Sequence, residues 1–104
     1  MTQQEMKDRT KRFALDIIRF CEDLPKGISS RAIAAQLVRS GTSVAANYRA
    51  ACRGRSRAEF VSKIGVAEEE ADETGLWLEL LLDSGLIAEK AVDRLVQEAE
   101  ALTK

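Results

Sequence analysis

Apolar residues recur at steps of three and four along almost the whole chain, which is the spacing of one face of an α-helix. Short polar or glycine-containing segments interrupt this pattern three times. The first interruption contains Pro25 and Gly27. These residues end a helix, because proline lacks an N–H group and glycine readily adopts the left-handed conformation found at helix ends. The second is RGRSR at residues 53–57, and the third includes Gly85. The pattern therefore predicts four amphipathic helices.

The apolar stripe of each predicted helix indicates which residues form the core. The four stripes, in chain order, are Met6, Thr10, Phe13, Ile17, Phe20 and Leu24; Ile33, Leu37, Ser40, Val44, Asn47 and Ala51; Phe60, Ile64, Ala67, Ala71, Thr74, Leu78 and Leu81; and Ala88, Ala91, Val92, Leu95, Ala99 and Leu102. The second stripe and the row beside it are rich in small residues, which let another helix approach closely. Gly41 lies in that row. Because glycine inside a helix costs about 1 kcal/mol relative to alanine, we interpret it as a close-packing position.

Serine residues predict where two of the helices begin. Ser29 or Ser30 is placed to cap the second helix, and Ser56 with Glu59 three residues later has the capping-box pattern before the third. Helices joined by such short turns run in alternating directions. The sequence thus predicts an all-α fold, an antiparallel up-down four-helix bundle that makes one domain of residues 1–104.

The segment GLWLELLLD, residues 75–83, has apolar residues around nearly the whole circumference of its helix. Leu78 belongs to the core stripe, Leu76 and Leu80 lie roughly opposite it, and Trp77 lies on its flank. An exposed apolar patch of this kind marks an interaction site, so we predict that Leu76, Trp77 and Leu80 help to form a subunit interface. The alternative is that the fourth helix and the loops cover them.

Three motifs resemble those of a known family: R-S-x-T-S-x-x-A-N at 39–47, R-S-x-x-E-F at 55–60 and E-T-x-x-W-L-E-L-L at 73–81. The chain resembles the four-helix-bundle proteins called 23S-rRNA intervening-sequence proteins. The resemblance implies an up-down bundle and assembly as a homopentameric ring, and no catalysis is established for the family. A relative, the accessory variability determinant of diversity-generating retroelements, is a basic pentamer that works with a reverse transcriptase and nucleic acid. This sequence departs from that pattern by its near-neutral charge, and it has Ala50 where many members carry glutamate.

The net charge of −1 hides an asymmetry between the two parts of the chain. Residues 1–63 hold 13 Lys and Arg against 6 Asp and Glu, whereas residues 64–104 hold 3 against 11. In a hairpin that turns near Gly54, Arg39 faces Glu70 and can pair with it. The acidic run EEEADE therefore lies roughly 20 Å from the hairpin tip, at about 1.5 Å per residue, and cannot neutralise it.

Four arginines, Arg49, Arg53, Arg55 and Arg57, lie at or near that tip, and three interpretations remain open. They contact acidic residues of the next subunit in a ring, they bind the phosphates of RNA or DNA or a nucleic-acid-processing protein, or they are a solvated turn. Tyr48 is the one nearby aromatic residue, so base stacking has little support.

The residues that catalysis and metal binding require are scarce. The chain has no histidine, which removes the usual serine and cysteine triads, and it has no glycine-rich phosphate loop. A helix spreads the carboxylates of EEEADE around its surface, which disfavours a metal site there. Cys21 and Cys52 lack metal-ligand spacing, and we interpret them as reduced core thiols. The sequence predicts no cofactor, no metal and no enzymatic activity.

Asn47 is polar on a core-facing stripe, and we predict that it fixes helix register at some cost in stability rather than binding a ligand. No stretch approaches the roughly 20 apolar residues of a membrane span, and the N-terminus is polar, so we expect a cytoplasmic protein. The function predicted is that of a structural or adaptor homo-oligomer. The alternative is a nucleic-acid-associated accessory protein that binds through the arginine-rich hairpin tip.

Overall fold

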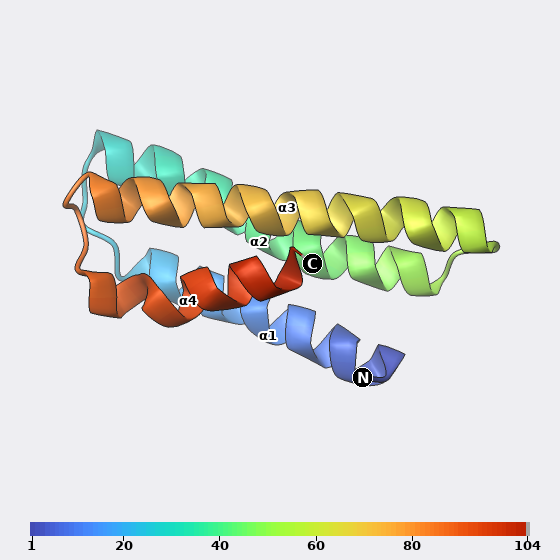
Figure 1. The fold of residues 1–104 in the computed structure, drawn as a ribbon. Helices are drawn as coiled ribbons and strands as arrows, with labels where there is room; N and C mark the ends of the chain where they lie inside the picture. The colour runs from blue at the N-terminus through green and yellow to red at the C-terminus, as the bar shows by residue number, and fades with distance from the viewer. Residues whose placement is uncertain (104) are drawn as a thin grey trace.

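The computed structural model describes residues 1–103, and within this range it contains α-helices and turns but no strand. The helices are α1 (Gln3–Glu22), α2 (Ile28–Cys52), α3 (Arg57–Asp83) and α4 (Glu89–Leu102). Each helix runs antiparallel to the one before it, and the long α2–α3 hairpin lies on one side of the bundle with α1 and α4 on the other (Figure 1). α1 packs on α2, α4 packs on α3, and α1 meets α4 along a shorter contact. The predicted all-α, antiparallel up-down four-helix bundle is confirmed.

The start of α2 corrects one prediction from the sequence. Gly27 is the N-cap residue of α2, and no side chain caps this helix. Ser29 and Ser30 therefore lie inside the helix rather than before it, and Ser30 is buried. Gly27 has an extended backbone, with φ 166° and ψ 169°, so the helix begins directly after it.

The start of α3 agrees with the sequence in part. Ser56 is the N-cap, and its side chain accepts a hydrogen bond from the Glu59 backbone N–H at 3.1 Å. The Glu59 carboxylate accepts from the backbone N–H of Arg55 at 2.6 Å, one residue earlier than a capping box requires. The third predicted interruption is also correct, because Gly85 follows α3 with a positive φ of 78°.

The core lies where the apolar stripes predict, among residues of all four helices. Its cluster comprises Phe13, Ile17, Leu37, Val44, Ala71, Leu78, Leu81, Val92, Leu95, Ala99 and Leu102. The small-residue row of α2 is a close-packing surface: a Cβ atom on Gly41 would lie 3.0 Å from Ile17 Cγ2 of α1. Thr74 of α3 and Ser40 of α2 are also buried, with their hydroxyl oxygens 2.8 Å apart.

The bundle is uneven in length, because α4 has 14 residues and α3 has 27. Thr103, at the end of α4, shares a surface groove with Ala71 in the middle of α3. Beyond that point α3 continues with α2 beside it and without α4 (Figure 1). Phe60 and Ile64 are half-buried on this extension, while Val61 is 56% exposed. The outer end of the hairpin therefore keeps apolar surface that the single chain does not cover.

Candidate functional site

The four predicted arginines lie at the outer end of the α2–α3 hairpin, as the sequence indicates. Arg49 is on the last turn of α2, Arg53 is its C-cap residue, Arg55 lies in the turn and Arg57 begins α3. All four side chains are exposed. The structure does not keep them together as one unit, because only Arg49 and Arg53 face α1.

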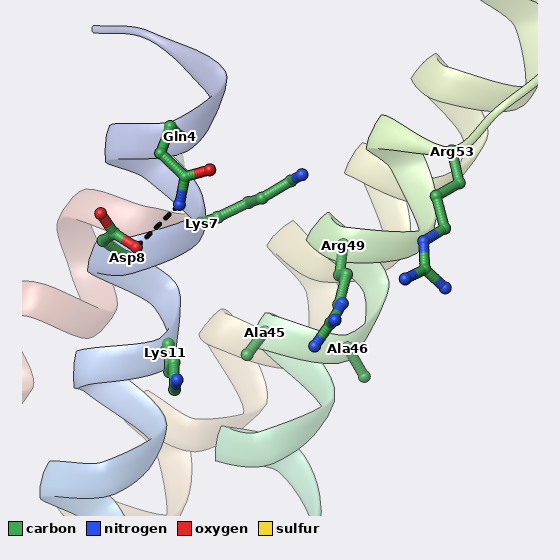
Figure 2. Close-up of a pocket in the computed structure, with 8 residues that line it drawn as sticks. All are labelled: Gln4, Lys7, Asp8, Lys11, Ala45, Ala46, Arg49 and Arg53. Atoms are coloured by element: carbon green, nitrogen blue, oxygen red, sulfur yellow. Dashed lines mark hydrogen bonds between the residues drawn. The ribbon is translucent and has the colours of Figure 1, made fainter.

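Arg49 and Arg53 form one wall of a groove of about 530 Å³ between α1 and α2. Lys7 and Lys11, one turn apart on α1, form the facing wall (Figure 2). Ala45 and Ala46 of α2, with Gln4 and Asp8 of α1, complete the lining. We call this site the cationic groove.

The four cations of the cationic groove have no acidic partner within the described chain. The ion pairs found among residues 1–103 involve Arg9, Arg19, Arg39 and Arg94, and none involves Lys7, Lys11, Arg49 or Arg53. The one acidic residue of the groove is Asp8, whose carboxylate accepts a hydrogen bond from Gln4 Nε2 at 3.0 Å. The lining thus carries four positive charges and one negative charge, an excess that favours an anionic ligand.

Two carboxylates of the acidic run, those of Glu70 and Glu73, pair with Arg39 of the same chain. Arg39 Nη1 of α2 lies 2.9 Å from Glu70 Oε2 of α3, which confirms the predicted cross-helix pair. The Arg39 guanidinium also pairs with Glu73. These contacts lie near the middle of the hairpin, so the carboxylates do not reach the arginines at its end.

The three residues of the predicted subunit interface have different environments in the single chain. Leu76 is 47% exposed and Leu80 is 41% exposed, one helical turn apart on α3. Trp77 instead packs partly buried against the core, and its indole Nε1 is buried with no hydrogen-bond partner among the described residues. Leu76 and Leu80 thus remain available for an intermolecular contact, whereas Trp77 is mostly covered by its own chain.

Asn47 is half-buried in the single chain rather than fully buried. Its side-chain amide donates to the Ser43 carbonyl and lies 2.9 Å from Ser43 Oγ, both in its own helix. The neighbouring Tyr48 takes the buried position, with 7% of its surface exposed. The register role of Asn47 therefore stays a prediction, and within residues 1–103 no other helix supplies a hydrogen-bond partner for its side chain.

The two cysteines, Cys21 and Cys52, are free thiols and partly buried. Burial, together with the nearby charge of Glu22, raises the pKa of Cys21 to about 11. Its thiol is therefore protonated at neutral pH, as expected for a thiol that packs rather than reacts.

Two features that would change the class of site are absent from the described part of the chain. Within residues 1–103, no group of three or more Asp, Glu, Cys or His side chains is arranged to hold a metal ion. In the same range, no helix has the length and apolar character needed to cross a membrane.

The fold and the site together define a four-helix bundle that carries a cationic groove at one end and exposed leucines on α3. The sequence model described as "23S rRNA-intervening sequence protein" matches residues 2–104, so the chain belongs to the 23S rRNA-intervening sequence protein family. The structure is similar to that of a protein of unknown function from the S23 ribosomal protein family of Bacteroides thetaiotaomicron VPI-5482. The TM-score is 0.86, with 32% sequence identity, and the match covers 99% of this chain and 92% of that chain. No curated protein matches the chain.

Lys7 and Lys11 belong to the site but are not among the residues predicted from the sequence. Their spacing of four residues places them on one face of α1, which the sequence alone shows. Which part of α2 this face meets depends on how far α1 slides and tilts along its neighbour. That quantity is set by close contacts such as Ile17 against Gly41, and only the structure supplies it.

Proposed function

We propose that the protein is a non-enzymatic, cytoplasmic helical-bundle protein that assembles with copies of itself and acts as a structural or adaptor oligomer. The observation that carries this proposal is the exposure of Leu76 and Leu80 on the outer face of α3. Two large apolar side chains one turn apart form a continuous apolar strip, which differs from the scattered single residues found on most surfaces.

The uncovered end of the hairpin adds to this apolar surface. Val61 is 56% exposed and Val66 is 38% exposed, both on the part of α3 that extends past α4. Fully burying a valine or leucine side chain contributes about 1.5–3 kcal/mol, so covering these half-exposed residues in every subunit would stabilise an assembly. A ring of five copies is the assembly that the family resemblance implies, and head-to-tail contacts between unlike faces close into rings.

The proposal is tested with a variant in which Leu76 and Leu80 are both changed to glutamine. A matched control changes Leu15 and Ile28, which are exposed on α1 and α2, to glutamine. Sedimentation velocity should show the wild type and the control as one assembly, and the Leu76→Gln/Leu80→Gln variant as a smaller species. If that variant keeps the wild-type sedimentation coefficient, the α3 strip is not the interface.

A second candidate function, that of a nucleic-acid-associated accessory protein, is favoured by the arginine-rich hairpin tip. Arg49, Arg53, Arg55 and Arg57 are exposed, and none is in an ion pair within residues 1–103. Fluorescence anisotropy with labelled single-stranded RNA and duplex DNA, at low and physiological salt, tests this role. Micromolar binding that weakens with salt and disappears when all four arginines become glutamine supports it. Absence of binding at low salt refutes it.

A further inference from the structure

We propose that the cationic groove binds a chain of phosphate groups, with Lys7 and Lys11 of α1 on one side and Arg49 and Arg53 of α2 on the other. The ligand that this chemistry fits best is the backbone of a single-stranded nucleic acid. The inference rests on the second candidate function and changes its site: α1 supplies half of the contacts, and Arg55 and Arg57 lie outside them.

The spacing of the cations matches a ligand with regularly repeated charges. On each wall the two cations are four residues apart, which is about 6 Å along a helix axis. Figure 2 shows the Lys7 side chain extending from α1 into the space in front of α2, where Arg49 and Arg53 lie. A phosphodiester strand carries one negative charge per nucleotide, so successive phosphates can meet successive cations.

The shape of the groove suits a flexible strand rather than a bulky domain. Ala45 and Ala46 precede Arg49 on α2, and their short side chains leave that part of the lining open. Arginine adds geometric fit, because its planar guanidinium donates paired hydrogen bonds to phosphate oxygens. Asp8 is the one opposing charge of the lining, and its carboxylate accepts a hydrogen bond from Gln4.

The alternative occupant is an acidic surface of a second copy, and the charges favour phosphates over it. Glu70 and Glu73 are paired with Arg39, and Glu98 is paired with Arg9, so these carboxylates already have partners within the chain. Glu68, Glu69 and Asp72 make no ion pair within residues 1–103, but they are fixed on the surface of one helix, whereas a flexible phosphate strand can place its charges against both walls of the groove.

The groove also predicts how such binding depends on sequence and salt. No aromatic side chain lines it, and the nearest aromatic residue in sequence, Tyr48, is only 7% exposed. Bases therefore have no stacking surface, and binding should be tolerant of base sequence. Four phosphate contacts to a single strand correspond to a log–log salt slope of about −2.8, which falls to about −1.4 when two cations are removed.

The experiment measures binding of a labelled single-stranded RNA by fluorescence anisotropy over a range of salt concentrations. It compares wild type with Lys7→Gln/Lys11→Gln and Arg49→Gln/Arg53→Gln. Matched controls that remove two charges are Arg55→Gln/Arg57→Gln and Lys26→Gln/Arg31→Gln, the latter at the opposite end of α1 and α2. Inorganic polyphosphate is a second ligand, circular dichroism checks the fold, and sedimentation velocity records the assembly of each variant.

The expected result is that both groove variants lose affinity by about tenfold or more and show the smaller salt slope, whereas both controls keep the slope. Polyphosphate binding with the same variant pattern, and no RNA binding, supports the phosphate site and assigns it to a free polyphosphate. RNA binding that is unaffected in Lys7→Gln/Lys11→Gln overturns the groove and leaves the arginine tip as the site. Loss of assembly in the groove variants would show that another copy occupies the groove. Absence of binding to either ligand overturns this proposal together with the second candidate function.

Discussion

Gly41 sets the distance between α1 and α2 at their closest approach. A Cβ atom there would lie within 3.0–3.2 Å of three atoms of Ile17, which is fully buried and has little freedom to move. Glycine is unfavourable in a helix by about 1 kcal/mol, so its presence is explained by this contact.

The change Gly41→Ala is therefore expected to destabilise the protein. Helix propensity favours alanine by about 1 kcal/mol, but overpacking costs about 1–3 kcal/mol, so we expect a net loss of about 1 kcal/mol. Gly65→Ala is the matched control on α3, because a Cβ there meets no atom within 4 Å. In chemical denaturation at equal chain concentration, the midpoint of Gly41→Ala should move to lower denaturant and that of Gly65→Ala to higher denaturant. A shift of both to higher denaturant would contradict the tight contact.

Cys21 should react slowly as long as the protein is folded. Burial raises its pKa from an ordinary value of 9.0 to about 11, and the thiolate is the reactive species, so the reactive fraction near pH 8 falls roughly 100-fold. The test is alkylation by iodoacetamide in a Cys52→Ser variant, native against urea-unfolded. Equal rates in the two states would show that the thiol is not buried.

The raised pKa of Cys21 also determines how the stability of the protein depends on pH. Folding favours the neutral thiol. The contribution of this thiol to the free energy of unfolding is therefore fully present below about pH 9 and is lost as the pH rises towards about 11. A Cys21→Ala variant should therefore lose stability less steeply than wild type across that window.

Some residue contacts could be predicted from the sequence and others could not. The Arg39–Glu70 pair follows from an antiparallel hairpin whose turn position is marked by Gly54, because one turn fixes every facing pair. The contact of Lys7 with the groove does not follow, because the α1–α2 turn fixes the near ends of those helices and not their separation at the far end.

At the scale of helices, α1 and α4 form the least extensive of the neighbouring contacts, and ion pairs reinforce it. Arg9 Nε and Nη2 of α1 donate to the two carboxylate oxygens of Glu98 at 2.8 and 2.6 Å. The side-chain hydrogen bond with Glu98 raises the pKa of Arg9. Asp16 and Arg94 make a second link between the same helices at 3.5 Å, but Arg94 is 82% exposed.

A double-mutant cycle on Arg9→Gln and Glu98→Gln should give a coupling of about 0.5–1 kcal/mol that decreases at high salt, because the pair is bidentate and partly buried. The cycle on Asp16→Asn and Arg94→Gln is the control and should give no measurable coupling, since one partner is largely solvated. Equal couplings in the two cycles would mean that geometry and burial do not decide the strength of these pairs.

The existence and order of the helices could be predicted because each carries a continuous apolar stripe and ends at a recognisable stop such as Gly85. The start of α2 could not, since Gly27 has no side chain to mark a cap and two serines after it supply a misleading signal. The length of α3 that α4 covers could not be predicted either, because periodicity does not show where one helix ends beside another.

At the scale of the whole molecule, the exposed groups are distributed unevenly. Leu76 and Leu80 are on the outer face of α3, the uncovered valines are on its extension past α4, and the cationic groove lies between α1 and α2. A single chain leaves all of these surfaces to solvent. An assembly that covers the apolar strip and leaves the grooves open would present several copies of the same cationic site, which strengthens binding to a long ligand by avidity.

The native mass of the wild-type protein tests most directly whether the chain assembles with copies of itself. Sedimentation equilibrium at physiological salt, over a range of micromolar concentrations, should give one species whose mass is a whole multiple of the 11.5 kDa chain. The family resemblance implies a multiple of five. A mass of one chain at every concentration would contradict the claim, and the exposed leucines would then need a different partner.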